Sequence, residues 1–154
     1  MPRYLRLELA LVRKYYITSI LHESLIRLGG ATKRILQAIG SHFGQYTFTD
    51  ISPSFFENAA NIFSAYQNQM VFKTYDAEKD PTLQGFAEGS QDVIVCSLVV
   101  HATANLERTL RYLRKLLRPG GYLLMAEGNS YGPLAVGAGF IFGTLSGWWL
   151  GVDE

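Results

Sequence analysis

The sequence predicts an α/β fold in which a parallel sheet is flanked by helices. Strand-like and helix-like segments alternate along the 154 residues, which is the pattern of doubly wound domains. Residues 91–97 form a nearly continuous apolar run, as expected of a strand covered on both faces of a parallel sheet. Three predicted strands end in an acidic residue, at Asp50, Asp76 and Glu127. Together these features predict a single domain with polar groups gathered at one edge of its sheet.

Residues 1–28 are predicted to be a helical leader that precedes this domain. Apolar residues are dense from Tyr4 to Leu28, and β-branched side chains interrupt them only around residues 17–20. Basic residues greatly outnumber acidic ones in the first 34 positions. We interpret this leader as a helix with a solvated basic face, and the alternative is a membrane-surface or targeting segment. The leader is also a candidate for sequence foreign to the domain.

The domain itself is predicted to span residues 29–154, and it begins with a helix and a strand. The helix starts at the glycine pair and ends at Gly40, because its apolar residues recur at every fourth position. Residues 45–50 alternate and are rich in β-forming side chains, so they are predicted to be a strand.

A second helix is predicted to start at Ser52 and Pro53. This pair is typical of an N-cap residue followed by proline in the first helical turn. We expect the helix to continue to about residue 66. Its expected buried residues are Phe55, Ala59, Ile62, Phe63 and Tyr66.

The second half of the domain is predicted to contain three strands and one helix. The strands cover residues 70–76, 91–97 and 121–127, and Pro119-Gly120-Gly121 ends the helix before the last of them. The helix carries an apolar stripe of Leu106, Leu110, Leu113 and Leu117. Its opposite face is basic, and we interpret that face as solvated rather than as a nucleic-acid interface.

Acidic residues at strand ends are candidates for holding a nucleoside. Asp50 follows Gly30 by about 20 residues, the spacing of a ribose-binding carboxylate after a glycine-rich turn. The alternative is that Asp50 only caps the helix near Pro53. Asp76, followed by Ala77, could accept a hydrogen bond from an adenine amino group, with a simple loop turn as the alternative.

His101 and Glu127 are candidates for acid–base chemistry. His101 lies just beyond the predicted central strand, where a neutral imidazole can act as a general base. Glu127 ends the neighbouring strand and could orient the imidazole through its other nitrogen. A capping or packing role for the histidine is the alternative.

Two further features limit the kind of protein this can be. Cys96 is the single cysteine, which excludes an internal disulfide and a multi-cysteine metal site and fits a cytoplasmic protein. Residues 133–150 are apolar for about the length of a membrane span, but their glycines favour a loop that packs tryptophans. A membrane segment remains a weak alternative there.

Short motifs along the chain resemble one enzyme family. They occur in the order YTFTDIS, FFENA, MVFKTYDAEKDP, QGF, HAT, LLRPGGYLLMAE and GWWLG. In order and spacing, from about Gly29 to Gly151, they look like the C-methyltransferase domain of fungal highly reducing polyketide synthases. The resemblance implies a Rossmann-like class I methyltransferase fold and S-adenosyl-L-methionine as cofactor. It also implies a substrate that is a β-ketoacyl thioester bound to an acyl carrier protein, with other synthase domains as partners.

The resemblance also implies roles for individual residues. His101 and Glu127 correspond to the family's catalytic base pair. Asp50 would hold the cofactor ribose, and Asp76 with Ala77 would line the adenine. The remaining implied contacts with the cofactor are those of Ser97, Gly29 and Gly30.

The chain departs from the family pattern in three ways. Of the family's glycine loop, which resembles LEIGAGTGG, only Gly29 and Gly30 are kept, and the preceding strand is not recognisable. Leu98 stands where the family has asparagine. The sequence also stops before the strands that complete the sheet, which suggests a fragment with an incomplete sheet. Two interpretations stay open: a C-methyltransferase, or a non-catalytic remnant that binds no cofactor.

Overall fold

A computed structural model describes residues 15–21 and 30–127 of the chain. Within these residues, five strands form one sheet in the order β3-β2-β1-β4-β5, and every neighbouring pair is parallel. The strands are β1 (Tyr16–Leu21), β2 (Gln45–Asp50), β3 (Met70–Thr74), β4 (Gln91–Ser97) and β5 (Leu117–Ala126). The helices are α1 (Gly30–Ile39), α2 (Phe56–Ile62) and α3 (Leu106–Leu116). The prediction of an α/β fold with a parallel sheet is therefore confirmed.

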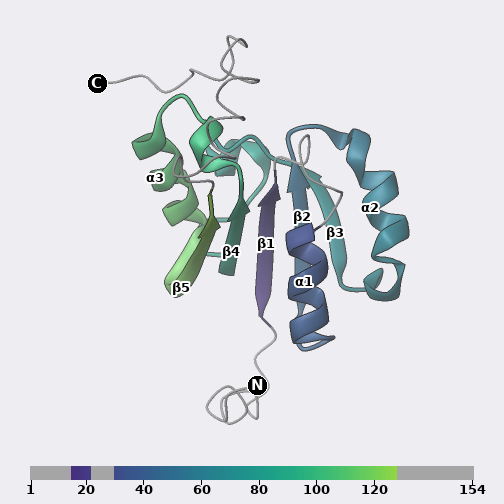
Figure 1. The fold of residues 1–154 in the computed structure, drawn as a ribbon. Helices are drawn as coiled ribbons and strands as arrows, with labels where there is room; N and C mark the ends of the chain where they lie inside the picture. The colour runs from purple at the N-terminus through teal and green to yellow at the C-terminus, as the bar shows by residue number, and fades with distance from the viewer. Residues whose placement is uncertain (1–14, 22–29, 128–154) are drawn as a thin grey trace, which may run out of the picture.

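The sheet is covered on both faces, so the domain has three layers (Figure 1). On one face, α1 and α2 pack over β1, β2 and β3 through a cluster that includes Leu36, Phe48 and Phe63. On the other face, α3 packs over β4 through Leu113 and Leu116. This two-sided cover explains the nearly continuous apolar sequence of β4.

The central strand β1 contradicts the expectation of a helix from Tyr4 to Leu28. Residues Tyr16–Leu21 form a strand that pairs with β2 on one side and β4 on the other. Ile17, Thr18 and Ile20 are β-branched and prefer a pleated, buried surface. The structure thus has five strands in the described residues where four were predicted. The predicted domain boundary at residue 28 stays a prediction, because residues 1–14 and 22–29 lie outside the described part.

The segment after β2 is less regular than the single helix that was predicted. Ser52 caps it as expected, accepting a hydrogen bond from the Ser54 N–H at 3.4 Å. The segment then divides into a 3₁₀ turn, α2 and a second 3₁₀ turn, Ser64–Tyr66. Ala59 and Phe63 are buried as predicted, but Ile62 is exposed.

Two strand boundaries in the second half, and the burial of one residue, also differ from the prediction. β3 ends at Thr74, two residues before Asp76. β5 begins at Leu117 and contains the Pro-Gly-Gly sequence that was expected to precede it, with an irregular register opposite Gln91 and Val93. Leu106, expected in the apolar stripe of α3, is exposed.

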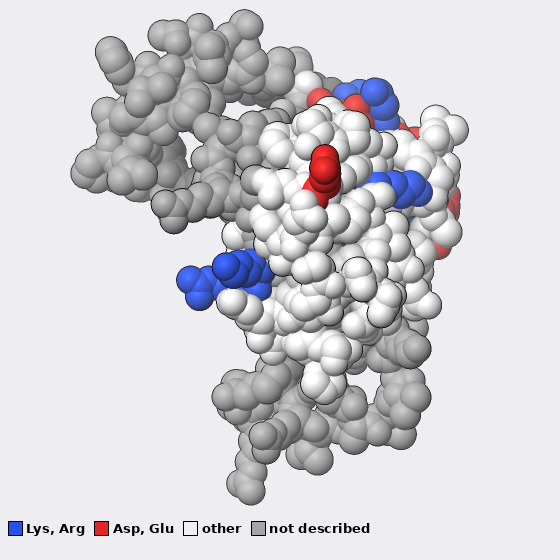
Figure 2. All heavy atoms as spheres, turned by 90° about the vertical axis from the view of Figure 1, so that its right-hand side faces the viewer, with Lys and Arg blue, Asp and Glu red and all other residues white. Residues whose placement is uncertain are grey.

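The face of the molecule over α2 and β3 carries few charged side chains (Figure 2). From residue 51 to residue 72, Glu57 is the only charged residue in the sequence. Lys73 on β3 turns toward the following loop, where its Nζ donates to the Gly85 carbonyl at 2.6 Å and lies over the Phe86 ring. Few charges therefore protect the edge strand β3 against pairing with another strand.

Candidate active site

Because all five strands are parallel, their carboxyl ends meet at one edge of the sheet, at the top of Figure 1. The register places Ser97 opposite Leu21 on one side and Ala126 on the other. Asp50 lies opposite Thr74 at the end of β3. The sequence-predicted residues therefore gather at the edge where open α/β sheets bind ligands.

His101 and Glu127 are in direct contact at this edge. His101 lies in a short 3₁₀ turn, η5 (Val100–Ala102), and its Nδ1 contacts Oε2 of Glu127, which follows β5. The exposed fraction is 42% for the His101 side chain and 24% for that of Glu127. When Nδ1 carries the proton and donates a hydrogen bond to the carboxylate, the lone pair of Nε2 is free to accept a proton. The expected pairing of these two side chains is present in the structure.

Backbone amides hold the other oxygen of Glu127, a feature that the sequence did not predict. Its Oε1 accepts hydrogen bonds from the N–H groups of Val99 at 3.2 Å and Val100 at 2.9 Å. The preceding residue, Leu98, donates its N–H to the Ala126 carbonyl at 2.9 Å. Leu98 has a φ of 56°, a left-handed conformation that is rare for a residue with a bulky side chain. Leu98 stands where the resemblance implies an asparagine, and this was the available signal, since asparagine tolerates this conformation.

Asp50 is buried at the end of β2, with 2% of its surface exposed. Its Oδ1 accepts a hydrogen bond from the Ser52 N–H at 2.8 Å, so the carboxylate supports the turn that leads to α2. The residue that caps the following helical turn is Ser52, so Asp50 supports the cap rather than forming it. The hydrogen bond from Ser52 occupies part of the acceptor capacity of the Asp50 carboxylate, and a ribose-binding role stays a prediction.

Asp76 follows β3 after Tyr75 and is engaged by its own loop. Its Oδ1 accepts from the Glu78 N–H at 3.0 Å, and its Oδ2 pairs with Lys79 Nζ at 3.0 Å. The neighbouring Ala77 is buried. A loop-turn role for Asp76 is therefore present, and its predicted adenine contact remains to be tested.

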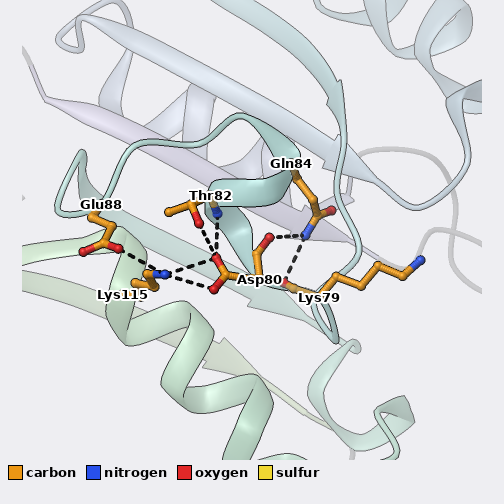
Figure 3. Close-up of polar contacts among 6 residues, drawn as sticks. All are labelled: Lys79, Asp80, Thr82, Gln84, Glu88 and Lys115. Atoms are coloured by element: carbon orange, nitrogen blue, oxygen red, sulfur yellow. Dashed lines mark hydrogen bonds and ion pairs between the residues drawn. The ribbon is translucent and has the colours of Figure 1, made fainter.

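Gln84 fixes the Asp76–Asp80 loop, and the sequence did not single out this side chain. Its Oε1 accepts from the Asp76 N–H at 2.7 Å. Its Nε2 donates to the carbonyls of Asp76 at 2.9 Å, Lys79 at 3.0 Å and Asp80 at 3.4 Å. Figure 3 shows Gln84 reaching the backbone of Lys79 and Asp80 from the 3₁₀ turn η4 (Pro81–Gln84). One amide side chain thus organises the loop that carries Asp76 and Ala77.

An ionic cluster ties this loop to α3 (Figure 3). Lys115 Nζ lies 2.9 Å from Asp80 Oδ2 and 3.0 Å from Glu88 Oε1. Hydrogen bonds from the Thr82 hydroxyl and from Lys115 lower the pKa of Asp80 from 3.8 to about 2. Hydrogen bonds to Asp80 and Glu88 raise the pKa of Lys115. Asp80 and Lys115 are therefore both charged at neutral pH.

Glu78 makes a further link across the same edge that the sequence did not predict. Its Oε1 accepts from the Ala104 N–H at 2.8 Å, in the segment between His101 and α3. Arg108 of α3 lies 3.9 Å from the same oxygen. The loop after β3 and the segment that carries His101 are therefore connected directly.

The remaining predicted cofactor residues are only partly described. Gly30 is the first residue of α1, and a side chain added there would meet nothing within 4 Å. Ser97 is the half-buried last residue of β4. Gly29 lies outside the described residues, as does the apolar tail at 133–150. In the part of the chain that the structure describes, no helix is long and apolar enough to cross a membrane.

Cys96 lies in the core beneath this edge. Burial, assisted by the negative charge of Glu127, raises the pKa of its thiol from 9.0 to about 12. The thiol is therefore protonated at neutral pH, which excludes a thiolate nucleophile. Within residues 15–21 and 30–127, no group of three or more histidine, cysteine or acidic residues is placed to hold a metal ion.

The methyltransferase domain family matches residues 26–123, a range that contains Asp50, Asp76 and His101 and ends within β5, before Glu127. The chain belongs to this family. The order of the five parallel strands agrees with it, and solved methyltransferase structures superpose on the described fold, as given below. The fold is therefore the Rossmann-like class I methyltransferase fold.

Among curated proteins, the chain is similar to fungal polyketide synthases. It is 62% identical over 126 residues to the highly reducing polyketide synthase bet1 of Neocamarosporium betae, which covers 82% of this chain and 4% of that protein. It is 56% identical over 126 residues to the hybrid PKS-NRPS synthetase poxE of Penicillium oxalicum, and this match covers 82% of this chain and 3% of that protein. The methyltransferase chain thus spans only a small part of the relatives it matches.

Among solved structures, it is similar to methyltransferases, one of which is a domain of a polyketide synthase. The CMeT domain of the citrinin polyketide synthase superposes with a TM-score of 0.76 at 34% identity, over 92% of this chain and 35% of that one. The trans-methyltransferase CalH, solved in complex with SAH, gives a TM-score of 0.75 at 35% identity, over 88% of this chain and 37% of that one. The resemblance found in the sequence motifs is confirmed.

Proposed function

We propose that this methyltransferase domain transfers a methyl group from S-adenosyl-L-methionine to the carbon between the two carbonyls of a β-ketoacyl thioester. The contact between His101 Nδ1 and Glu127 Oε2 carries this proposal. It supplies a base at the carboxyl edge of the sheet, oriented by a carboxylate. The family membership and the similarity to carbon methyltransferases support the same reaction.

The residues at the carboxyl edge suit this cofactor. S-adenosyl-L-methionine supplies, when bound, an electrophilic methyl group on a positively charged sulfur. Asp50 offers a buried carboxylate for the ribose hydroxyl groups, and Asp76 with Ala77 would border the adenine. Ser97, at the end of β4, and Gly30, at the start of α1, would flank the methionine portion.

His101 would remove the proton from the substrate carbon. A carbon flanked by two carbonyls is acidic enough for an imidazole to deprotonate when the enolate is stabilised. The proton would move to Nε2, and Glu127 would keep Nδ1–H oriented and stabilise the imidazolium that forms. The carbanion so formed would then attack the methyl group in line, so that the new carbon–carbon bond forms as the methyl–sulfur bond breaks and S-adenosyl-L-homocysteine leaves. This requires that the two reactants be held together.

The second candidate is a methyltransferase-derived remnant that binds no cofactor. The sequence of residues 21–30, LHESLIRLGG, favours it, since it keeps only two glycines of the loop that lets the backbone approach the cofactor. Such a remnant would retain the sheet and the His101–Glu127 contact without catalysis.

The partners we propose follow from the relatives. An acyl carrier protein would present the thioester, and other polyketide synthase domains would surround this one, because the chain matches only 3–4% of such synthases. We also propose a cytoplasmic location, in keeping with the single, buried and unpaired Cys96.

Calorimetric titration with S-adenosyl-L-methionine, followed by an assay on a β-ketoacyl pantetheine thioester, tests the proposal. We expect cofactor binding in the original chain and in His101→Ala, with methylated product from the original chain alone. Removing a general base should lower the rate by about 10²–10⁴-fold. His42→Ala is the matched control, because His42 is exposed and contacts only the Ile39 carbonyl. A folded chain that binds no cofactor would refute the enzymatic proposal and leave the remnant.

A further inference from the structure

Leu98 has a backbone conformation that its own side chain disfavours. It is the single non-glycine residue with positive φ among residues 15–21 and 30–127. Its side chain does not belong to either buried cluster of the core. The left-handed conformation is therefore imposed by contacts of the backbone, and such strain is commonly retained next to functional groups.

Those contacts are three successive N–H groups that bind two acceptor atoms of neighbouring residues. Leu98 donates to the Ala126 carbonyl at 2.9 Å, and thereby continues the ladder between β4 and β5. Val99 and Val100 both donate to Oε1 of Glu127, at 3.2 Å and 2.9 Å. The acceptors belong to two consecutive residues, so the chain after β4 binds the chain after β5 without a break.

The conformations of Leu98 and Val99 explain why these N–H groups converge. Leu98 is left-handed, with φ 56°, and Val99 is right-handed, with φ −118° and ψ −47°. Successive residues of opposite hand turn their N–H groups to the same side and form a concave anion site, called a nest. The anion in this nest is the carboxylate of Glu127.

Occupation of the nest determines which oxygen His101 meets. With Oε1 bound by two amides, Oε2 remains for the imidazole, and it contacts Nδ1. His101 directly follows Val100, so the nest and the histidine are consecutive in the chain. A change of conformation at Leu98 would displace the carboxylate and the imidazole together.

We propose that Leu98 is a positioning residue: its left-handed backbone turns the N–H groups of Val99 and Val100 onto Oε1 of Glu127, and this nest fixes Glu127 and, through it, the Nδ1–H tautomer of His101. The catalytic meaning of this tautomer rests on the proposed function, but the nest itself does not. Because the backbone and not the side chain is required, glycine or asparagine should replace Leu98 without loss. A β-branched residue should not.

The experiment is ¹⁵N NMR of histidine-labelled protein, which distinguishes the two neutral tautomers, with His101→Gln to assign the signal. We expect the Nδ1–H form in the original chain, in Leu98→Gly and in Leu98→Asn, and its loss in Leu98→Ile. Leu83→Ile is the matched control, since Leu83 is exposed. Retention of the Nδ1–H form in folded Leu98→Ile, or its loss in the glycine variant, would overturn the proposal.

A second measurement covers the case in which Leu98→Ile does not fold. In Glu127→Ala, we expect amide hydrogen exchange to accelerate at Val99 and Val100 by at least tenfold, and to stay unchanged at Leu98, whose acceptor is the Ala126 carbonyl. Unchanged exchange at Val99 and Val100 would contradict the nest. Neither measurement requires cofactor, so a chain that fails to bind S-adenosyl-L-methionine can still support or refute this inference.

Discussion

Replacing Gln84 by alanine should loosen the loop that carries Asp76. The side chain makes three hydrogen bonds of 2.7–3.0 Å to backbone atoms and a weaker fourth of 3.4 Å. The bonds to the N–H and carbonyl of Asp76 are partly buried, whereas the one to the Lys79 carbonyl is exposed. Water can replace the exposed bond but replaces the buried ones less well.

The magnitude follows from these contacts. A typical hydrogen bond contributes about 0.5–1.5 kcal/mol net, and a buried group left unpaired costs about 1–3 kcal/mol. Two partly buried bonds lost together should therefore lower the free energy of unfolding by about 1–3 kcal/mol. Gln84→Glu should be at least as harmful, because a carboxylate would face three carbonyl oxygens while it keeps the bond from the Asp76 N–H.

Urea unfolding of Gln84→Ala and Gln84→Glu measures this change, with hydrogen exchange at the Asp76 amide as the local readout. Gln67→Ala is the matched control, because Gln67 is an exposed residue at the end of a 3₁₀ turn. If the proposed function holds, cofactor affinity should fall in the Gln84 variants and not in Gln67→Ala. A change within about 0.5 kcal/mol, the range of ordinary surface substitutions, would refute the reasoning.

Three further predictions concern charge and pH. Arg118→Ala leaves the carboxylate of Asp92, which is 4% exposed, without its cation, so urea unfolding should show that the free energy of unfolding falls by about 3–5 kcal/mol. Arg111→Ala, at an exposed ion pair, is the control and should cost under about 1 kcal/mol. Equal losses in the two variants would contradict the assignment. The pKa of Asp80 is lowered to about 2, so the stability that its carboxylate contributes is complete above its ordinary pKa of 3.8 and is lost as the pH falls toward 2. Acid unfolding should therefore depend less steeply on pH in Asp80→Asn. An unchanged pH profile would argue against the cluster. Because the pKa of Cys96 is raised, the thiol ionises in the unfolded chain but not in the core, and stability should fall as the pH rises from 9 toward 12. This loss of stability at high pH should be absent in Cys96→Ala. Rapid reaction of the native thiol with a disulfide reagent would contradict its burial.

Much of the fold could be predicted because its local patterns are strong. β2 and β4 have the bounds that were predicted, Gln45–Asp50 and Gln91–Ser97. Alternation in β2 and the apolar run of β4 each identify a strand within a few residues. α1 also ends where Gly40, with φ +59°, was expected to stop it. The local sequence was therefore sufficient to predict these three elements.

Residues Tyr16–Leu21 show where local pattern was insufficient. The surrounding sequence is dense in helix-forming apolar residues, and six residues are too few to outweigh it. They are a strand because β2 and β4 lie on either side and satisfy their backbone hydrogen bonds. Pairing between segments far apart in the chain decided this conformation.

By itself, the sequence determined the α/β class, the family resemblance and the pairing of His101 with Glu127, because parallel strands bring their carboxyl ends to one edge. Only the tertiary structure showed the nest that follows Leu98 and the hydrogen bonds of Gln84. Both join a side chain to backbone groups, and backbone N–H and carbonyl groups are the same in nearly every residue. Their partners depend on the path of the chain, which no side-chain pattern records.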